Sequence, residues 1–137
     1  MASKRKSFVV LNRVSEAFEL YNALTERPFA EVRGERVIFD LGSYAHICED
    51  EELLIRIKHI TETLVNPDEI RRSHHRERPF REVYVNTFYT EEKDTVGEPF
   101  LVVLDRRPVL RFWTCILPTP GYLRAVRRGK LIWKPKN

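Results

Sequence analysis

The chain has 137 residues, enough for one domain with a modest core, and we expect residues 1–137 to form a single domain. A hydrophobic fraction of 42%, a charged fraction of 32% and a net charge of +4 describe a folded protein and argue against a disordered chain. No apolar run approaches the roughly 20 residues that cross a bilayer, which argues against a membrane protein. The N-terminal residues also lack the apolar core of a signal peptide.

The N-terminal third predicts a strand, a helix and a second strand. Residues 6–14 form a short β-type run, and Ser15 can cap a helix whose apolar residues recur at helical spacing until Pro28. Residues 34–42 lie between two glycines and predict a strand, and residues 43–50 predict a loop. His46 would therefore lie in a loop.

A second helix is predicted to start at Asp50, whose carboxylate can cap it, with two glutamates in its first turn. Its apolar residues recur at helical spacing up to Leu64, and Asn66-Pro67 breaks the pattern. A short turn over residues 67–70 and a basic loop over residues 71–81 follow.

From residue 81 the hydrophobic period changes from helical to two, which predicts strands. Four strand-like runs follow, at residues 81–90, 100–105, 109–117 and 130–134. The turn over residues 105–108 predicts that the middle two form a hairpin. Helices followed by an antiparallel sheet indicate an α+β fold with N-terminal helices packed on four to five strands.

The two cysteines, Cys48 and Cys115, each have an isoleucine on one side and form no CxxC pair. We expect two buried free thiols in a reducing compartment, so the predicted location is the cytoplasm.

Two basic clusters indicate a polyanionic partner. Residues 121–137 hold six basic residues and no acidic one, and residues 71–81 hold only Glu77 against their arginines. Aromatic residues such as Phe80 and Tyr122 lie within them, a composition that suits nucleic acid. The alternative for each cluster is a solvated surface.

The four histidines, at positions 46, 59, 74 and 75, have no zinc-site spacing, and no HExxH or CxxC is present. His74 and His75 are adjacent, so in a regular strand their rings would point to opposite faces. The five glycines form neither a P-loop nor a GxGxxG pattern. We therefore expect no metal and no cofactor.

Metal-free cleavage of RNA remains chemically possible, because the 2′-hydroxyl is an internal nucleophile beside the scissile phosphate. Histidine suits the proton transfers, since its pKa lies near neutrality. Arginine suits the phosphate, and a threonine or tyrosine hydroxyl can donate to a phosphate oxygen.

Several short motifs support that chemistry: His46-Ile47 before a helix, "ETLVNPDEI" at its end, "RRS", "VYVNTFY", "FLVVL" and "FWTCIL". As a set, from about residue 42 to 133, they resemble the barnase–EndoU–colicin–RelE nuclease superfamily, closest to its phage-associated branch of small predicted ribonucleases. The resemblance implies helices packed on a curved antiparallel sheet, with the active site across one face of that sheet.

The resemblance also implies site residues. His46 would be the general acid or base, Arg72 would stabilise charge in the transition state, and Thr114 would contact a phosphate oxygen. The sequence departs from the family after Thr114, where Cys115-Ile116 replace a small residue and an aromatic one. Further substrate contacts would come from these residues: Arg71, Ser73, Tyr84, Arg124, Arg127 and Arg128. Tyr84 has sheet packing as its alternative role, and the three late arginines have solubility as theirs.

The sequence thus predicts a metal-independent endoribonuclease of the toxin or effector type. Its partners would be RNA and an acidic antitoxin or immunity protein that covers the basic face. Two alternatives remain at this point: a non-catalytic RNA- or protein-binding module on the same fold, and a structural phage or prophage protein.

Overall fold

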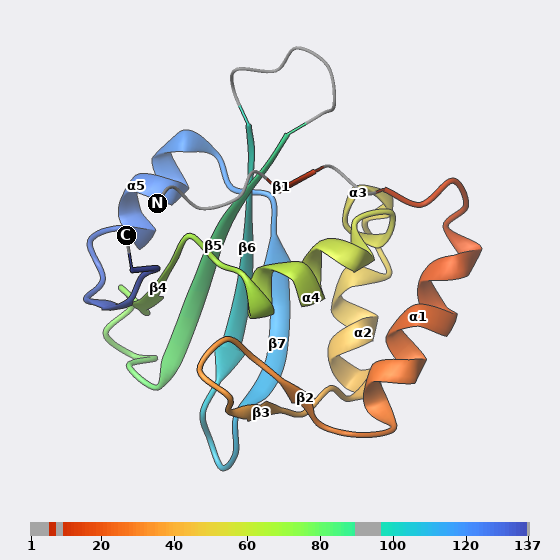
Figure 1. Cartoon of the computed structure of the whole chain (residues 1–137), viewed down its shortest axis with the longest axis horizontal. Coiled ribbons are helices and arrows are strands. Elements are labelled where there is room, and N and C mark those ends of the chain that lie inside the picture. The colour runs from red at the N-terminus through yellow and green to blue at the C-terminus, as the bar shows by residue number, and fades with distance from the viewer. Residues whose placement is uncertain (1–5, 8–9, 90–96, 137) are drawn as a thin grey trace.

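The computed structural model describes residues 6–7, 10–89 and 97–136. Figure 1 shows helices gathered beside a twisted sheet, with one further helix near the C-terminus. The helices are α1 (Ser15–Thr25), α2 (Leu41–Ile47), α3 (Glu51–Leu54), α4 (Ile57–Val65) and α5 (Pro120–Val126). The strands are β1 (Lys6–Ser7), β2 (Phe29–Ala30), β3 (Arg36–Val37), β4 (Glu69–Arg72), β5 (Arg81–Tyr89), β6 (Glu98–Asp105), β7 (Arg111–Ile116) and β8 (Leu131–Trp133).

The main sheet has the strand order β7-β6-β5-β4-β8, and β1 adds a short parallel pairing to β5. All other pairings in this sheet are antiparallel, so the predicted α+β class is confirmed. Two details differ from the prediction. The sheet has six strands, because β1 joins it, and the helices are not all N-terminal, because α5 follows β7.

The region before the second helix was predicted incorrectly. Residues 34–42 do not form one strand, since β3 covers only two residues and Ile38 makes an isolated bridge to Arg111. The predicted loop at residues 43–50 is largely helical. Asp40 accepts a hydrogen bond from the Ser43 N–H at 2.8 Å, and this cap starts α2 before His46 is reached.

The predicted helix after Asp50 is interrupted. Asp50 caps it as expected, accepting from the Glu52 N–H at 2.9 Å, but the segment divides into α3 and α4 around Arg56. Helix α4 ends at Val65, before the Asn-Pro break, as predicted. The expected turn and basic loop begin with a strand instead, because residues 69–72 pair with both β5 and β8.

The later predictions hold where the structure describes the chain. Strands β5, β7 and β8 lie within the predicted runs and the β6–β7 hairpin forms as predicted, but β6 begins at Glu98, two residues before its predicted run. Most of the connector between β5 and β6, residues 90–96, and part of the first predicted strand lie outside the described residues.

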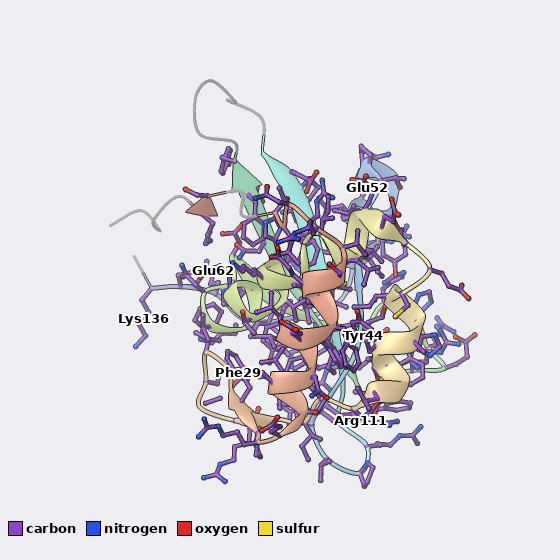
Figure 2. The ribbon with its side chains drawn as sticks, turned by 90° about the vertical axis from the view of Figure 1, so that its right-hand side faces the viewer. Phe29, Tyr44, Glu52, Glu62, Arg111 and Lys136 are labelled. Carbon is purple, nitrogen blue, oxygen red and sulfur yellow. The ribbon has the colours of Figure 1, made fainter. Side chains whose placement is uncertain are left out.

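The two faces of the sheet are covered differently. Helices α1–α4 pack on one face, over a core rich in aromatic residues such as Tyr21, Phe88 and Phe112. Figure 2 looks onto α1 and α2, with Tyr44 between them, and the Tyr44 ring lies 4.8 Å from that of Tyr21. Helix α5 packs on the other face through a small aliphatic core: Val83, Val85, Leu101, Val103 and Val126.

Both thiols are free, as predicted, but only Cys115 is buried; Cys48, just after α2, is exposed. Within the described residues, no helix combines the length and apolar character needed to pass through a membrane.

Candidate active site

A hollow of about 200 Å³ opens on the α5 face of the sheet. We call it the histidine hollow. It is lined by Ser73, His74, His75, Arg78, Arg81, Val83, Val103, Trp113, Thr114, Ile116 and Tyr122. Two valines of the aliphatic core contribute to this lining, and histidine, arginine and hydroxyl side chains from three other parts of the chain surround them.

The β4–β5 loop supplies most of the polar groups. Its ends are tied by the Ser73 N–H, which donates to the Arg81 carbonyl at 2.9 Å. Inside the loop the Ser73 hydroxyl accepts from the His75 N–H at 3.1 Å, and the Arg78 N–H donates to the His75 carbonyl at 3.1 Å. These turns place His74 with His75 on the same hollow, which an extended strand would not do.

Strand β7 supplies the opposite wall through a β-bulge. Val103 pairs with Thr114, but the next residue of β6, Leu104, pairs with Phe112, so Trp113 has no partner of its own in the register. A bulge of this kind re-aims side chains. Trp113 and Thr114 consequently both line the hollow, although they are neighbours in a strand.

Helix α5 closes the third side with Tyr122. The Thr119 hydroxyl caps the helix by accepting from the Tyr122 N–H at 3.1 Å, and Pro120 occupies the first turn. The end of α5 is held to β4 by Arg71, which donates to the carbonyls of Arg127 and Gly129 at 2.8 and 3.0 Å. A side chain at Gly129 would meet the β4 backbone, so α5 approaches this closely only with glycine there.

His74 carries the clearest electrostatic signal in the hollow. Its ring is half-buried, lies 4.1 Å from the His75 ring and 5.8 Å from the Tyr122 ring, and its Nδ1 is buried with no hydrogen-bond partner among the described residues. Burial, followed by the nearby charges of His75 and Arg128, lowers the pKa of His74 below its ordinary value. The ring is therefore neutral at neutral pH and can accept a proton.

The arginines form a crowded positive wall. Burial and then the charge of Arg78 lower the pKa of Arg81, although an arginine stays charged near neutrality. Its guanidinium lies 4.4 Å from the centre of the Trp113 ring, and its Nε lies 3.7 Å from an oxygen of Asp105. An anion in the hollow would relieve this repulsion, because it would pair with both guanidinium groups.

The three residues predicted as catalytic are separated. Thr114 lines the histidine hollow, as does Ser73. Arg72 instead lines a second hollow, on the helix-covered face. His46 is exposed on α2, beside β7, with its ring 5.7 Å from that of Trp113. His46 lies beside β7, and Arg72 lies on β4. Strands β6 and β5 lie between these two strands, so β7 and β4 are about 14 Å apart across the sheet.

Tyr84 lies inside the helix-side core and is fully buried. Its hydroxyl donates to Glu31 at 2.6 Å and accepts from Arg33 at 2.9 Å. Burial raises the pKa of Tyr84 well above its usual range. The ring packs in the sheet and is turned away from the histidine hollow.

The remaining predicted contacts are distributed around α5. Besides its backbone contacts, Arg71 pairs with Glu69, and Arg127 reaches the same carboxylate at 3.5 Å. Arg124 and Arg128 are exposed on α5 and just after it, and Arg128 acts on His74 through its charge.

Sequence reasoning did not select His74, His75, Arg78 or Arg81 for the site, although the basic cluster that contains them was recognised. The available signal was two histidines inside "RRSHHRERPFR". In a strand, adjacent side chains point to opposite faces, so the adjacency of His74 and His75 argued against a common target. In the structure the two residues occupy a turn, so this argument does not apply. Among the described residues, no three side chains of histidine, cysteine, aspartate or glutamate gather as a metal site would require.

Comparison with known proteins gives one match. A family model described as phage-Barnase-EndoU-ColicinE5/D-RelE like nuclease 2 matches residues 13–134. This is the superfamily that the sequence motifs resemble, and the match starts earlier than residue 42, so that it includes α1. No curated protein and no solved structure matches the chain.

Proposed function

The chain belongs to this phage-associated family of barnase–EndoU–colicin–RelE nucleases, and from this premise we propose that it is a metal-independent endoribonuclease of the toxin or effector type. The observation that carries the proposal is the composition of the histidine hollow. It gathers two imidazoles, two guanidinium groups and a threonine hydroxyl around a space of about 200 Å³. Cleavage of RNA through its own 2′-hydroxyl requires these types of group.

In the proposed reaction the neutral ring of His74 accepts the proton of the 2′-hydroxyl, and the 2′-oxygen attacks the adjacent phosphorus. The bond from phosphorus to the 5′-oxygen breaks, and His75 in its protonated form donates a proton to that oxygen. The products are a 2′,3′-cyclic phosphate and a free 5′-hydroxyl. The lowered pKa of His74 supports its role as base, since it keeps one ring of the pair neutral.

Arg78 and Arg81 would stabilise the negative charge that develops on the phosphate, and the Thr114 hydroxyl would donate to one of its oxygens. This keeps Thr114 in the role that the sequence predicts and moves the charge stabilisation from Arg72 to the loop. Trp113 and Tyr122, at the sides of the hollow, offer aromatic surface on which a base can stack.

The proposed partners follow from the charge around the hollow. The β4–β5 loop and α5 carry exposed arginines, including Arg78, Arg124 and Arg128. An acidic antitoxin or immunity protein would cover this surface and block the entry of RNA.

The decisive experiment compares His74→Ala with His46→Ala on a single-stranded RNA substrate. We expect His74→Ala to lower kcat/KM by at least about 10², the usual contribution of a general base, and His46→Ala to retain most activity. A loss of kcat/KM of this size in His46→Ala but not in His74→Ala would assign the role of general base to His46 on α2. The cyclic phosphate, identified by mass spectrometry, tests the chemistry separately.

The same preparations address the two alternatives. A non-catalytic binding module would show RNA affinity but no cleavage in the unchanged protein. A structural phage protein would show neither. Growth arrest on induction that disappears with His74→Ala would support a toxin, whereas cleavage without growth arrest would contradict that part of the proposal.

A further inference from the structure

A second hollow, of about 330 Å³, lies on the helix-covered face of the sheet. We call it the Phe80 hollow, and its lining is Arg33, Arg72, Pro79, Phe80, Glu82, Arg106 and Ile132. We propose that it is a binding subsite for single-stranded RNA, occupied by nucleotides that flank the one cleaved in the histidine hollow. This inference rests on the proposed function and adds the path of the substrate across the protein.

The first argument is that, of the three arginines that line the Phe80 hollow, Arg72 alone has no carboxylate partner among the described residues. Arg33 donates to Glu82 at 2.8 Å, and Arg106 donates to the other oxygen of Glu82 at 2.6 Å and also to Glu35. Arg72 is exposed, and no side-chain partner is found for its guanidinium among the described residues. A phosphate is the anion that such a planar, exposed guanidinium binds with two hydrogen bonds.

The second argument is the presence of an aromatic ring beside that cation. Phe80 is half-buried, and the guanidinium of Arg107 lies 3.4 Å from the centre of its ring. Proteins that bind single-stranded nucleic acid combine positive charge with aromatic surface for stacking. Phe80 and Arg72 both line the hollow, and Arg107 adds a positive charge against the Phe80 ring.

The third argument is the connection between the two hollows. In β5, Glu82 lines the Phe80 hollow, whereas its neighbours Arg81 and Val83 line the histidine hollow. Consecutive residues of a strand point to opposite faces, so the hollows lie back to back with the β4–β5 loop as the edge between them. A strand of RNA that crosses this loop passes from one to the other over basic side chains.

Hydrogen bonds of two glutamates, Glu82 and Glu31, hold the lining of the Phe80 hollow in place. Glu31 is buried and accepts from Tyr84 and from the backbone N–H groups of Arg33 and Glu35. These bonds fix the β2–β3 turn against the sheet. The subsite is thus formed before RNA arrives, which lowers the cost of binding.

The test compares Arg72→Gln with the unchanged protein on two substrates and one ligand. The substrates are a dinucleotide with a single scissile phosphate and an RNA of about eight nucleotides. The ligand is a 2′-fluoro oligonucleotide of the same length, which cannot be cleaved by 2′-hydroxyl attack. Arg13→Gln is the matched control, since Arg13 is an exposed arginine just before α1 and, among the described residues, its one acidic partner is Glu16 at 3.6 Å.

We expect Arg72→Gln to weaken binding of the 2′-fluoro oligonucleotide roughly tenfold, as for the loss of one charge-assisted contact. The dependence of its affinity on salt should fall by about 0.7 in logarithmic slope. The variant should raise KM for the longer RNA and leave cleavage of the dinucleotide unchanged, and Arg13→Gln should change none of these.

Three results would overturn the subsite. Unchanged affinity in Arg72→Gln would remove it, as would absence of oligonucleotide binding by the unchanged protein. An equal loss of cleavage on both substrates would place Arg72 in the chemistry instead. Because the ligand is not cleaved, its binding answers the question even if the protein proves not to be a nuclease.

Discussion

The two faces of the main sheet differ in what their side chains do. The helix-covered face buries large aromatic residues, and its polar groups include hydrogen-bonded pairs, such as Tyr84 with Glu31. The α5 face has a small aliphatic core, and beside it the histidine hollow leaves cations and imidazoles crowded together. The first arrangement stabilises the fold, whereas the second has a net positive charge that Asp105 balances in part and a bound anion would balance further. Substitutions on the two faces should therefore change different measured quantities.

The largest expected effect concerns the histidine hollow. Arg81→Gln should lower kcat by about 10² or more, because it removes a preorganised positive charge from the phosphate in the transition state. The free energy of unfolding should fall by no more than about 1–3 kcal/mol, because relief of the repulsion from Arg78 offsets part of the loss of the ion pair with the buried carboxylate of Asp105. Chemical denaturation and single-turnover kinetics measure the two quantities. A large loss of stability with unchanged cleavage would assign Arg81 to the fold.

The next effect concerns His59, a buried residue of α4 whose ring lies 3.8 Å from that of Phe88. Burial, and then the charge of Arg56, lower the pKa of His59 to about 4. As the pH falls below about 6.5 the unfolded chain binds a proton that the folded chain does not, so stability is lost between pH 6.5 and 4. At 1.36 kcal/mol for each pKa unit, this loss amounts to about 3 kcal/mol.

His59→Phe, which keeps an aromatic ring against Phe88, should lack this part of the acid destabilisation. The measurement is the difference between urea unfolding at pH 7 and at pH 4.5 in both proteins, so that carboxylate titrations cancel. Parallel losses in the two proteins would show that His59 is protonated in the folded state.

A smaller loss is expected at Tyr84. Tyr84→Phe removes one hydrogen bond to the buried carboxylate of Glu31, which should cost about 1–3 kcal/mol in the free energy of unfolding. Cleavage should stay unchanged, because the ring is in the helix-side core. A lower kcat/KM at full stability would instead support the substrate contact that the sequence predicts for Tyr84.

The smallest expected effect is electrostatic and concerns the pKa of His74 in the histidine hollow. Arg128 lowers the pKa of His74 through its charge. In Arg128→Gln that pKa should therefore rise, and the acid limb of the profile of kcat/KM against pH should move to higher pH. Arg124→Gln is the control, because Arg124 lies nearby on α5 but is absent from the charges that act on His74. If the acid limb of this profile stays at the same pH in Arg128→Gln, a group other than His74 is the base.

The sequence by itself determined what depends on near neighbours in the chain. The cap at Asp50, the break at Asn66-Pro67 and the period-two run of β5 are local signals, and all three hold. The family was also readable from short motifs, because each covers a single element or the junction of two neighbouring elements. Local signals failed at residues 43–47 and 69–72, where a helix cap and pairing with two strands outweighed the turn-like composition.

Only the tertiary structure decided which residues meet. His74 and His75 share a hollow because hydrogen bonds tie the β4–β5 loop into turns, and Thr114 joins them because β7 contains a bulge. Arg72 faces the other side of the sheet because strand residues alternate, so a shift of one position moves a side chain to the opposite face. The strand register that sets this alternation depends on partners far along the chain, which no local pattern of residues contains.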